Sequence, residues 1–83
     1  MLYTLLYTKT AASDIKKLDI VVRKRIKKKI EHFAEDPIFH AKKLINFQIG
    51  SYRWRIGDYR IIFDIDGKNI VILHVKHRRE SYK

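Results

Sequence analysis

Four arginines in the second half of the sequence have the chemistry to hold an anion. Arg53 and Arg55 lie two residues apart, Arg60 follows five residues later, and Arg78 lies four residues before Tyr82. A planar guanidinium group donates two hydrogen bonds at once to a phosphate and also stacks on bases. An aromatic ring beside such groups offers a surface on which a single-stranded base can stack. These residue types therefore predict a site for a phosphate-bearing ligand.

Alternating side chains place three of these arginines on one face of a sheet. Residues 52–56 and 59–65 alternate in a period of two, which predicts the two strands of a hairpin. If their first apolar series faces the core, Arg53, Arg55 and Arg60 all point to the opposite face. A single carboxylate shares that face, so mutual repulsion favours anion binding over a purely structural role. The expected core side chains are Tyr52, Trp54, Ile56, Tyr59, Ile61, Phe63 and Ile65.

The N-terminal half has the pattern of one strand followed by two helices. Residues 2–8 are rich in aromatic and β-favouring types and predict a strand. From residue 11 the pattern is helical, with Thr10 or Ser13 as the N-cap. Asp19 can cap a second helix that continues to residue 34 or 35. Its apolar face is expected to consist of Val22, Ile26, Ile30 and Phe33.

Proline and glycine mark the remaining boundaries. Pro37 ends the second helix, because the residue before a proline disfavours the helical conformation. Residues 40–44 are expected to be a connector, with room for one helical turn. Asp66 and Gly67 predict a tight turn, and residues 69–77 predict the last strand. Val71, Leu73 and Val75 are in phase along that strand.

The order strand, helix, helix, strand, strand, strand predicts an α+β fold. We expect a single domain over residues 1–83, with an antiparallel sheet and both helices packed on one of its faces. The 46% hydrophobic content excludes a disordered chain, and the lack of cysteine excludes disulfides and thiolate metal sites. His32 and His40 have no partner at ligand spacing, so no metal and no cofactor are expected. Apolar runs are too short for a membrane span and no signal peptide is recognised, so the expected location is the cytoplasm.

The net charge of +10 points to a polyanionic partner. Part of it lies on the polar face of the second predicted helix. Two interpretations of this face stay open: a solvated surface, or a patch that contacts the RNA backbone and gains affinity through counterion release. The basic residues concerned are Arg23, Lys24, Lys27 and Lys28, and Arg79 beside Arg78 is a further candidate for RNA contact.

Two segments resemble the RelE/ParE toxin superfamily, and within it the RelE branch. The first is YRWRIGDYRIIF at residues 52–63, and the second is HVKHRRESY at residues 74–82. The resemblance extends over the whole chain, including the two helices and the break at Pro37. It implies the toxin of a type II toxin–antitoxin system that acts as an mRNA interferase, an RNA endonuclease that cuts messenger in the ribosomal A site. By the same resemblance, the catalytic positions fall on Arg53, Arg55, Arg60, Arg78 and Tyr82.

The resemblance also implies partners and leaves alternatives. Messenger RNA, the ribosome and a RelB-like antitoxin are the expected partners. The antitoxin would be acidic, fold on binding and form a two-plus-two complex. A ParE-like toxin that poisons DNA gyrase shares the fold and is the first alternative. A non-catalytic module that binds RNA or protein is the second.

Cleavage of RNA without a metal sets specific chemical demands. The substrate's own 2′-hydroxyl would attack the adjacent phosphate, which leaves a 2′,3′-cyclic phosphate and a 5′-hydroxyl. The enzyme must align that hydroxyl, stabilise the extra charge on the phosphorane and move two protons. Arginine is a poor general base at neutral pH. His77, Glu80 and Tyr82 are therefore the candidates for proton transfer.

Overall fold

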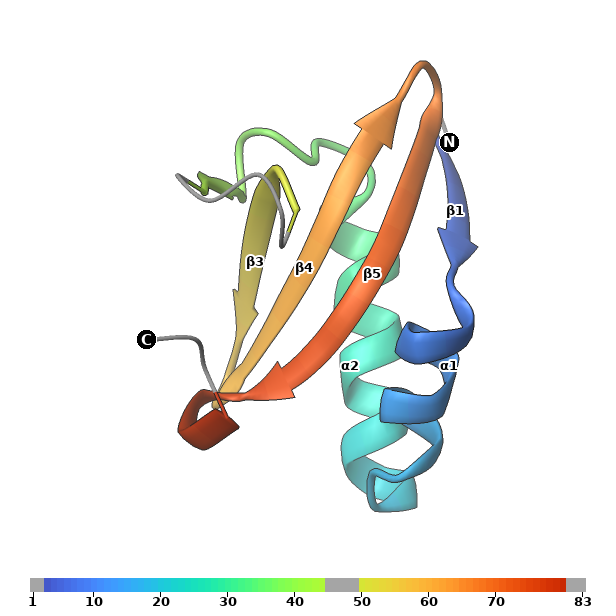
Figure 1. Cartoon of the computed structure of the whole chain (residues 1–83), viewed down its shortest axis with the longest axis vertical. Coiled ribbons are helices and arrows are strands. Elements are labelled where there is room, and N and C mark those ends of the chain that lie inside the picture. The colour runs from blue at the N-terminus through green and yellow to red at the C-terminus, as the bar shows by residue number, and fades with distance from the viewer. Residues whose placement is uncertain (1–2, 45–49, 81–83) are drawn as a thin grey trace.

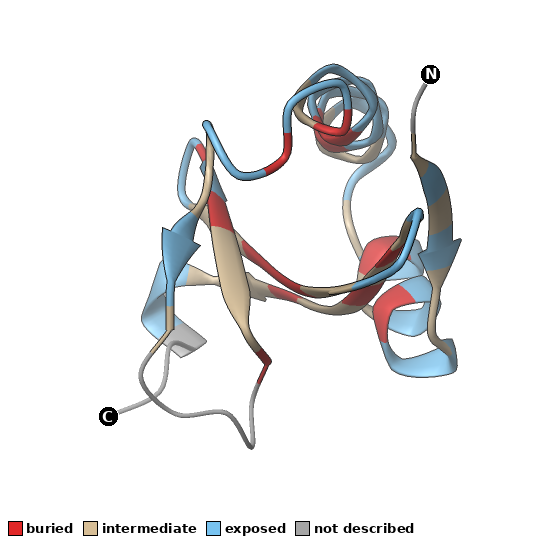
Figure 2. Ribbon diagram, turned by 90° about the horizontal axis from the view of Figure 1, so that it is seen from above, coloured by how far each residue is buried: buried red, intermediate tan, exposed pale blue. Residues whose placement is uncertain are grey.

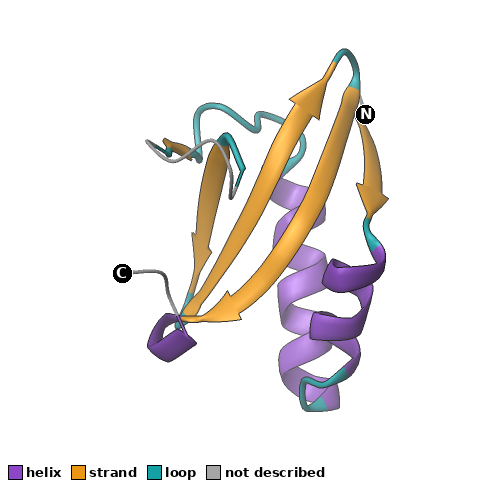
Figure 3. Ribbon diagram, in the orientation of Figure 1, coloured by secondary structure: helices purple, strands orange, loops and turns teal. Residues whose placement is uncertain are grey.

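The computed structural model describes residues 3–44 and 50–80, and these contain two α-helices and five strands. Figures 1 and 3 show how they are arranged. The predicted α+β class and the order of the six main elements are confirmed. A 3₁₀ turn at Arg78–Glu80 follows the last strand. The elements are β1 Thr4–Tyr7, α1 Lys9–Lys16, α2 Ile20–Phe33, β2 Lys42–Lys43, β3 Tyr52–Ile56, β4 Tyr59–Asp66 and β5 Asn69–His77.

The sheet is mixed rather than wholly antiparallel. Its strand order is β1-β5-β4-β3-β2, with antiparallel pairing from β5 through β2. The exception is β1, which pairs with β5 in the parallel sense, from Thr4 opposite Asn69 to Tyr7 opposite Ile72. Parallel neighbours need a long crossover connection. The two helices and the β3–β4 hairpin lie between β1 and β5 in sequence, so this requirement is met.

Helix α1 begins earlier than the sequence indicates. Thr8 is its N-cap, and the hydroxyl of Thr8 accepts a hydrogen bond from the Ala11 amide at 3.1 Å. The prediction of Thr10 or Ser13 as the cap is wrong. Thr8 has extended backbone angles directly after β1, so it can end the strand and satisfy a free helix amide at the same time.

The first turns of α1 also bind the edge of β5 beyond the end of β1. The Thr8 hydroxyl donates to the Leu73 carbonyl at 3.1 Å, and the Asp14 carboxylate accepts from the Val75 amide at 3.0 Å. These side chains satisfy backbone groups of β5 that β1 no longer reaches. The helix is thereby fixed to the strand that leads into the C-terminal arginines.

Helix α2 follows the prediction closely. Asp19 caps it by accepting from the Val21 amide at 3.1 Å, and the helix ends at Phe33. Ile26 and Ile30 are fully buried, and Val22 and Phe33 pack against the same core. The spacing of four, four and three residues therefore did identify the buried face of α2.

One core fills the space between the helices and the covered face of the sheet (Figure 2). Trp54 is completely buried at its centre, with its ring 4.0 Å from that of Phe63 and 5.8 Å from that of Phe33. The indole nitrogen of Trp54 donates to the Pro37 carbonyl at 3.0 Å, which satisfies its only polar group. The predicted assignment of Trp54 to the core is confirmed.

The phase predicted for β5 holds only at its C-terminal end. Val75 is buried, but further back Ile70 and Ile72 are buried instead of Val71 and Leu73. The cause is an irregularity in the pairing with β4, where the partner jumps from His74 to Ile72 and leaves Leu73 unpaired. One extra residue reverses the alternation of all residues before it.

Residues 40–44 do not form a helical turn. Lys42 and Lys43 form the short edge strand β2, which pairs with Arg53 and Tyr52 of β3. No periodicity can identify a strand of two residues, which explains why the sequence predicts only a connector here.

Gly50 and Ser51, directly before β3, lie against the open face of the sheet, which is the face without helices. Gly50 lies against Ile62 so closely that a β-carbon at residue 50 would clash with the Ile62 side chain. The amide of Ser51 donates to the Asp64 carboxylate at 2.7 Å. Ile62 is therefore only 2% exposed although it points away from the main core.

The described residues show neither a cluster of metal ligands nor a membrane-spanning helix. Residues 3–44 and 50–80 contain no group of three or more His, Asp or Glu side chains arranged to hold a metal ion. Within the same ranges, no helix has both the length and the apolar composition needed to cross a membrane.

Candidate functional site

A row of three cations crosses the open face of the sheet. Arg55 of β3 lies directly opposite Arg60 of β4, and Arg60 lies directly opposite Lys76 of β5. Residues that pair in this way have β-carbons about 4.5–5.5 Å apart and share one face. Like charges at such positions destabilise a sheet. The row is therefore a feature that folding alone does not favour.

A second row runs parallel to the first, two residues further along the strands. It consists of Lys42 of β2, Arg53 of β3, Ile62 of β4 and His74 of β5. Arg53 lies diagonally across from Arg60, within reach of long side chains. Ile62 separates Arg53 from His74, so the imidazole lies nearer to the Lys76 end of the first row.

Carboxylates do not neutralise this face in the part of the chain that the structure describes. No Asp or Glu there lies within 4.0 Å of the charged atoms of Arg53, Arg55 or Arg60. Asp64 shares the open face, as the alternation predicts, but its carboxylate binds the Ser51 amide. The positive charge is therefore available to a ligand.

The guanidinium of Arg53 responds to this arrangement. Partial burial, and then the positive charges of Arg60 and Arg55, lower the pKa of Arg53 below its usual value. Both influences disfavour the charged form. The three arginines are therefore close enough to repel one another, and an anion between them would relieve that repulsion.

Arg78 extends the cationic face at the end of the sheet. Its amide donates to the Asp58 carbonyl at 2.7 Å, which continues the pairing of β5 beyond His77. Its guanidinium lies 3.8 Å from the Asp58 carboxylate, and both side chains are about 60% exposed. An ion pair with this exposure contributes little to stability. Arg78 is therefore held near the Arg55–Arg60 end of the face and remains free to turn toward a ligand.

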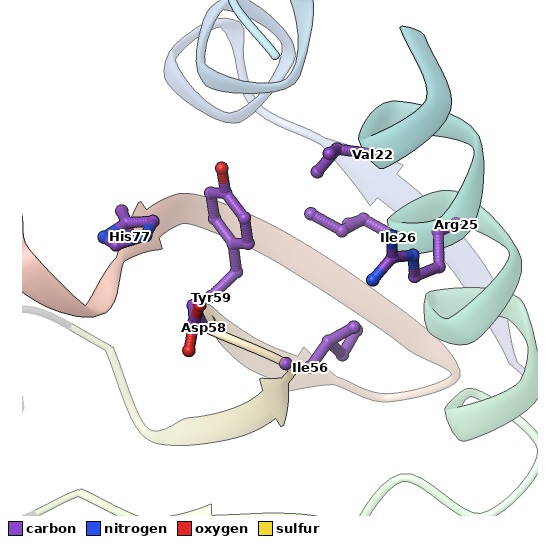
Figure 4. Close-up of a pocket in the computed structure, with 8 residues that line it drawn as sticks. Val22, Arg25, Ile26, Ile56, Asp58, Tyr59 and His77 are labelled. Carbon is purple, nitrogen blue, oxygen red and sulfur yellow. The ribbon is translucent and has the colours of Figure 1, made fainter. Parts of the chain in front are cut away.

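His77 lies on the other face of the sheet. It pairs with Tyr59, one position beyond the pair of Arg60 and Lys76, and the two rings meet edge to face at 5.1 Å. Its Nδ1 accepts from the Arg79 amide at 3.2 Å. Figure 4 shows His77 and Tyr59 at a pocket beside α2, together with Val22, Arg25, Ile26, Ile56 and Asp58. Strand alternation thus separates His77 from the arginines with which the sequence grouped it.

The basic residues of α2 have different surroundings. The Arg23 guanidinium donates to the carbonyls of Lys16 and Leu18 at 3.1 and 3.2 Å, so it ties α2 to the end of α1. Lys24, Lys27 and Lys28 are exposed. Lys27 borders a hollow between the helices, whereas Lys28 borders a different one beside His32. Arg23 therefore has a structural role, and the three lysines stay candidates for RNA contact.

Of the predicted site residues Arg79 and Tyr82, the structure describes only Arg79. Arg79 is exposed in the 3₁₀ turn next to Arg78 and stays a candidate for RNA contact. Tyr82 lies outside the described residues.

Three further residues of this face differ in how far the sequence predicts them. The parity of His74 permits either a place on this face or an ordinary surface position, and the pairing with Ile62 puts it on the face. Lys76 alternates with Val75 and could have been placed by parity alone. Lys42 could not have been placed, because only the pairing of β2 with β3 brings it beside Arg53.

Replacing Arg53 with glutamine is expected to stabilise the fold by about 0.2–1 kcal/mol, since it removes a like charge from the face. Folding lowers the pKa of Arg53, so the charged guanidinium destabilises the folded state at every pH below that lowered pKa, neutral pH included. This destabilisation would disappear only as the pH rises through the lowered pKa. The measurement is the urea midpoint at low and high salt. The gain should shrink with salt, which screens charges. Arg79→Gln, an exposed change, is the control, and a loss of stability in Arg53→Gln would contradict the repulsion.

Comparison with known proteins assigns the chain to a family. Residues 5–82 match the family described as the ParE toxin of the type II toxin–antitoxin system parDE. The chain belongs to the RelE/ParE superfamily of toxins. It is therefore the toxin component of a type II toxin–antitoxin system.

Individual relatives agree with this assignment. The chain is 35% identical over 81 residues to Toxin RelE3 of Methanocaldococcus jannaschii, covering 93% of this chain and 92% of the relative. It is 33% identical over 90 residues to Toxin RelG of Mycobacterium tuberculosis, covering 100% and 99%. Among solved structures, the RelBE2 toxin–antitoxin complex of Mycobacterium tuberculosis contains a similar chain. The TM-score is 0.83 at 30% identity, with coverage of 94% of this chain and 100% of that one.

Proposed function

We propose that this toxin is a ribosome-dependent mRNA endonuclease whose open face holds the scissile phosphate of the messenger. The observation that carries the proposal is the uncompensated group of Arg53, Arg55, Arg60 and Lys76 on one face, with Arg78 at its end. A phosphate between these side chains would replace their mutual repulsion with charge-assisted hydrogen bonds.

The cations suit the transition state of a metal-free cleavage. The 2′-oxygen forms a bond to phosphorus, the bond to the 5′-oxygen breaks, and negative charge builds up on the phosphorane between these events. Because the paired strands fix where these arginines start, their guanidinium groups would need little rearrangement to stabilise that charge. Arg60, which lies between Arg55 and Lys76, is the best placed to contact the non-bridging oxygens.

Two protons must move in the same reaction. One leaves the 2′-hydroxyl and the other reaches the 5′-oxygen. Histidine is the side chain whose charge changes most readily near neutral pH. His74 is the histidine on the open face, and its Nδ1 is buried without a hydrogen-bond partner among the described residues. We therefore add His74 to Glu80 and Tyr82 as candidates for proton transfer, and His77 becomes the weakest of them.

The proposed partners follow from the charge and from the relatives. The similar toxin of Mycobacterium tuberculosis was solved in a toxin–antitoxin complex. A RelB-like antitoxin with an acidic segment that folds on binding would neutralise a toxin of charge +10. The same charge would favour binding to messenger and ribosomal RNA in the cytoplasm, where translation takes place.

Poisoning of DNA gyrase is the second candidate function, and the match to the ParE family description favours it. The experiment that separates the two adds the purified toxin to a reconstituted translation reaction and, in parallel, to gyrase with supercoiled DNA. We expect messenger cut at the ribosomal A site, with 2′,3′-cyclic phosphate and 5′-hydroxyl ends, and no gyrase–DNA cleavage complexes. Intact messenger with accumulated gyrase–DNA complexes would reverse the order. RNA binding without damage to either target would indicate a non-catalytic module.

A further inference from the structure

An exposed aromatic cluster lies in the segment between α2 and β2. It consists of His32 and Phe33 at the end of α2 and of Phe39 and His40, and we call it the α2–β2 aromatic cluster. The His40 ring stacks on Phe33 at 4.4 Å, and the Phe39 ring meets His40 edge to face at 5.1 Å. Phe39 is 79% exposed, the highest value among the exposed large apolar residues that the structure describes.

The segment that carries Phe39 is pinned to the core. Trp54, which is fully buried, donates to the Pro37 carbonyl at 3.0 Å, and the Ala41 amide donates to the Ile38 carbonyl at 3.1 Å. Phe33 connects the cluster to the Trp54 ring. The backbone that carries Phe39 is therefore held in place, which lowers the conformational entropy lost when a flat ligand binds to the Phe39 ring.

Positive charge surrounds the cluster on two sides. On the α2 side, a hollow of about 390 Å³ is lined by Arg25, Lys28, Lys29 and His32, and His32 belongs to both features. On the β2 side, Lys43 pairs with Tyr52 and Lys42 pairs with Arg53 of the open face. Since neighbouring strand residues point to opposite faces, β2 carries one lysine toward each face. Cationic side chains therefore lie on both faces at this edge of the sheet.

We propose that the α2–β2 aromatic cluster binds single-stranded RNA, with an unpaired base stacked on Phe39 and the adjoining phosphates held by Lys43 and by the basic hollow of α2. This inference rests on the proposed RNA substrate and places a second contact with it, away from the cleavage site. An exposed ring within a cationic surface is the combination that single-stranded nucleic acids bind. A second copy of this chain would bring a like charge of +10 to the same surface and is therefore disfavoured.

The test measures binding separately from cleavage. A fluorescein-labelled oligonucleotide with 2′-O-methyl groups at every position has no nucleophile, so its anisotropy reports affinity alone. We compare Phe39→Ala, Phe39→Leu and Phe39→Trp, with Ile38→Ala as the matched control, because Ile38 is the neighbouring exposed apolar residue at 49%.

Stacking on an aromatic side chain is worth about 1–3 kcal/mol per base, or roughly 5- to 150-fold in affinity. Phe39→Ala and Phe39→Leu should both bind the oligonucleotide more weakly by that factor. Phe39→Trp keeps an aromatic ring and should bind with wild-type affinity, as should the control Ile38→Ala. If Phe39→Leu binds RNA like the wild type, the inference is overturned, and equally so if Phe39→Ala weakens only antitoxin binding.

Failure of this inference and failure of the proposed function give different results. If the wild type cuts messenger but substitution of Phe39 leaves oligonucleotide affinity unchanged, RNA binding by the α2–β2 aromatic cluster is wrong and the proposed function stands. If affinity depends on the aromatic ring at residue 39 but messenger stays intact on translating ribosomes, RNA binding by the α2–β2 aromatic cluster stands and the nuclease proposal is wrong.

Discussion

Replacing Arg60 with alanine is expected to lower messenger cleavage by about 100- to 1,000-fold, the usual cost of removing one preorganised donor from a charge-stabilising site. Arg60 has cations directly opposite on both sides, Arg55 and Lys76, and Arg53 on the diagonal. A phosphorane bound on this face would lose its central partner. The measurement is the rate of messenger cleavage on translating ribosomes at saturating toxin.

The same variant should keep its fold, because its side chain has no described carboxylate partner and removing a like charge lowers the repulsion on the face. Circular dichroism and the melting temperature check this. Arg60→Lys keeps the charge but not the planar fork, so an intermediate rate is expected. Lys68→Ala removes an exposed cation from the β4–β5 turn and serves as the control. An unchanged rate in Arg60→Ala would refute the site.

Replacing Trp54 with alanine is expected to destabilise the protein by about 3–5 kcal/mol, the range for large aromatic truncations in cores. The change would remove the ring that contacts both Phe63 and Phe33, and it would leave the buried Pro37 carbonyl without its donor. Small domains have a total stability of about 5–15 kcal/mol, so this single change would approach complete unfolding.

Urea denaturation measures the effect, and two further variants define its origin. Trp54→Phe keeps most of the ring and loses the hydrogen bond, so a smaller loss is expected. Phe39→Ala removes an aromatic ring from the surface and should stay within about 0.5 kcal/mol of the wild type, as exposed substitutions usually do. If Trp54→Ala and Phe39→Ala were equally stable, the assignment of Trp54 to the centre of the core would be incorrect.

Much of this molecule could be predicted from local sequence patterns. The amphipathic spacing in α2 and the alternation in β3 and β4 each extend over enough residues to define a period. That alternation also placed Arg53, Arg55 and Arg60 on the face without helices, because side-chain direction in a strand depends on parity alone. The arginine face is therefore the best-predicted part of the site.

The features that could not be predicted depend on contacts between distant segments. The unpaired Leu73 shifts the phase of β5, and it is defined only by the pairing with β4. Thr8 is the cap of α1 because β1 ends there against β5. Lys42 joins the face only through the two-residue strand β2. In each case the deciding interaction is with a residue that the local pattern does not contain.

The parallel pairing of β1 with β5 also affects how the chain reaches its native state. The ribosome makes β1 before β5, and Thr4 of β1 lies opposite Asn69 of β5. Closing such a long loop carries an entropic cost before any contact compensates for it, so sheets of this kind fold slowly. A nascent chain that ends before residue 69 has no partner for β1 and lacks both Lys76 and Arg78. The sheet and its cationic face can therefore form only after residues 69–78 have been synthesised.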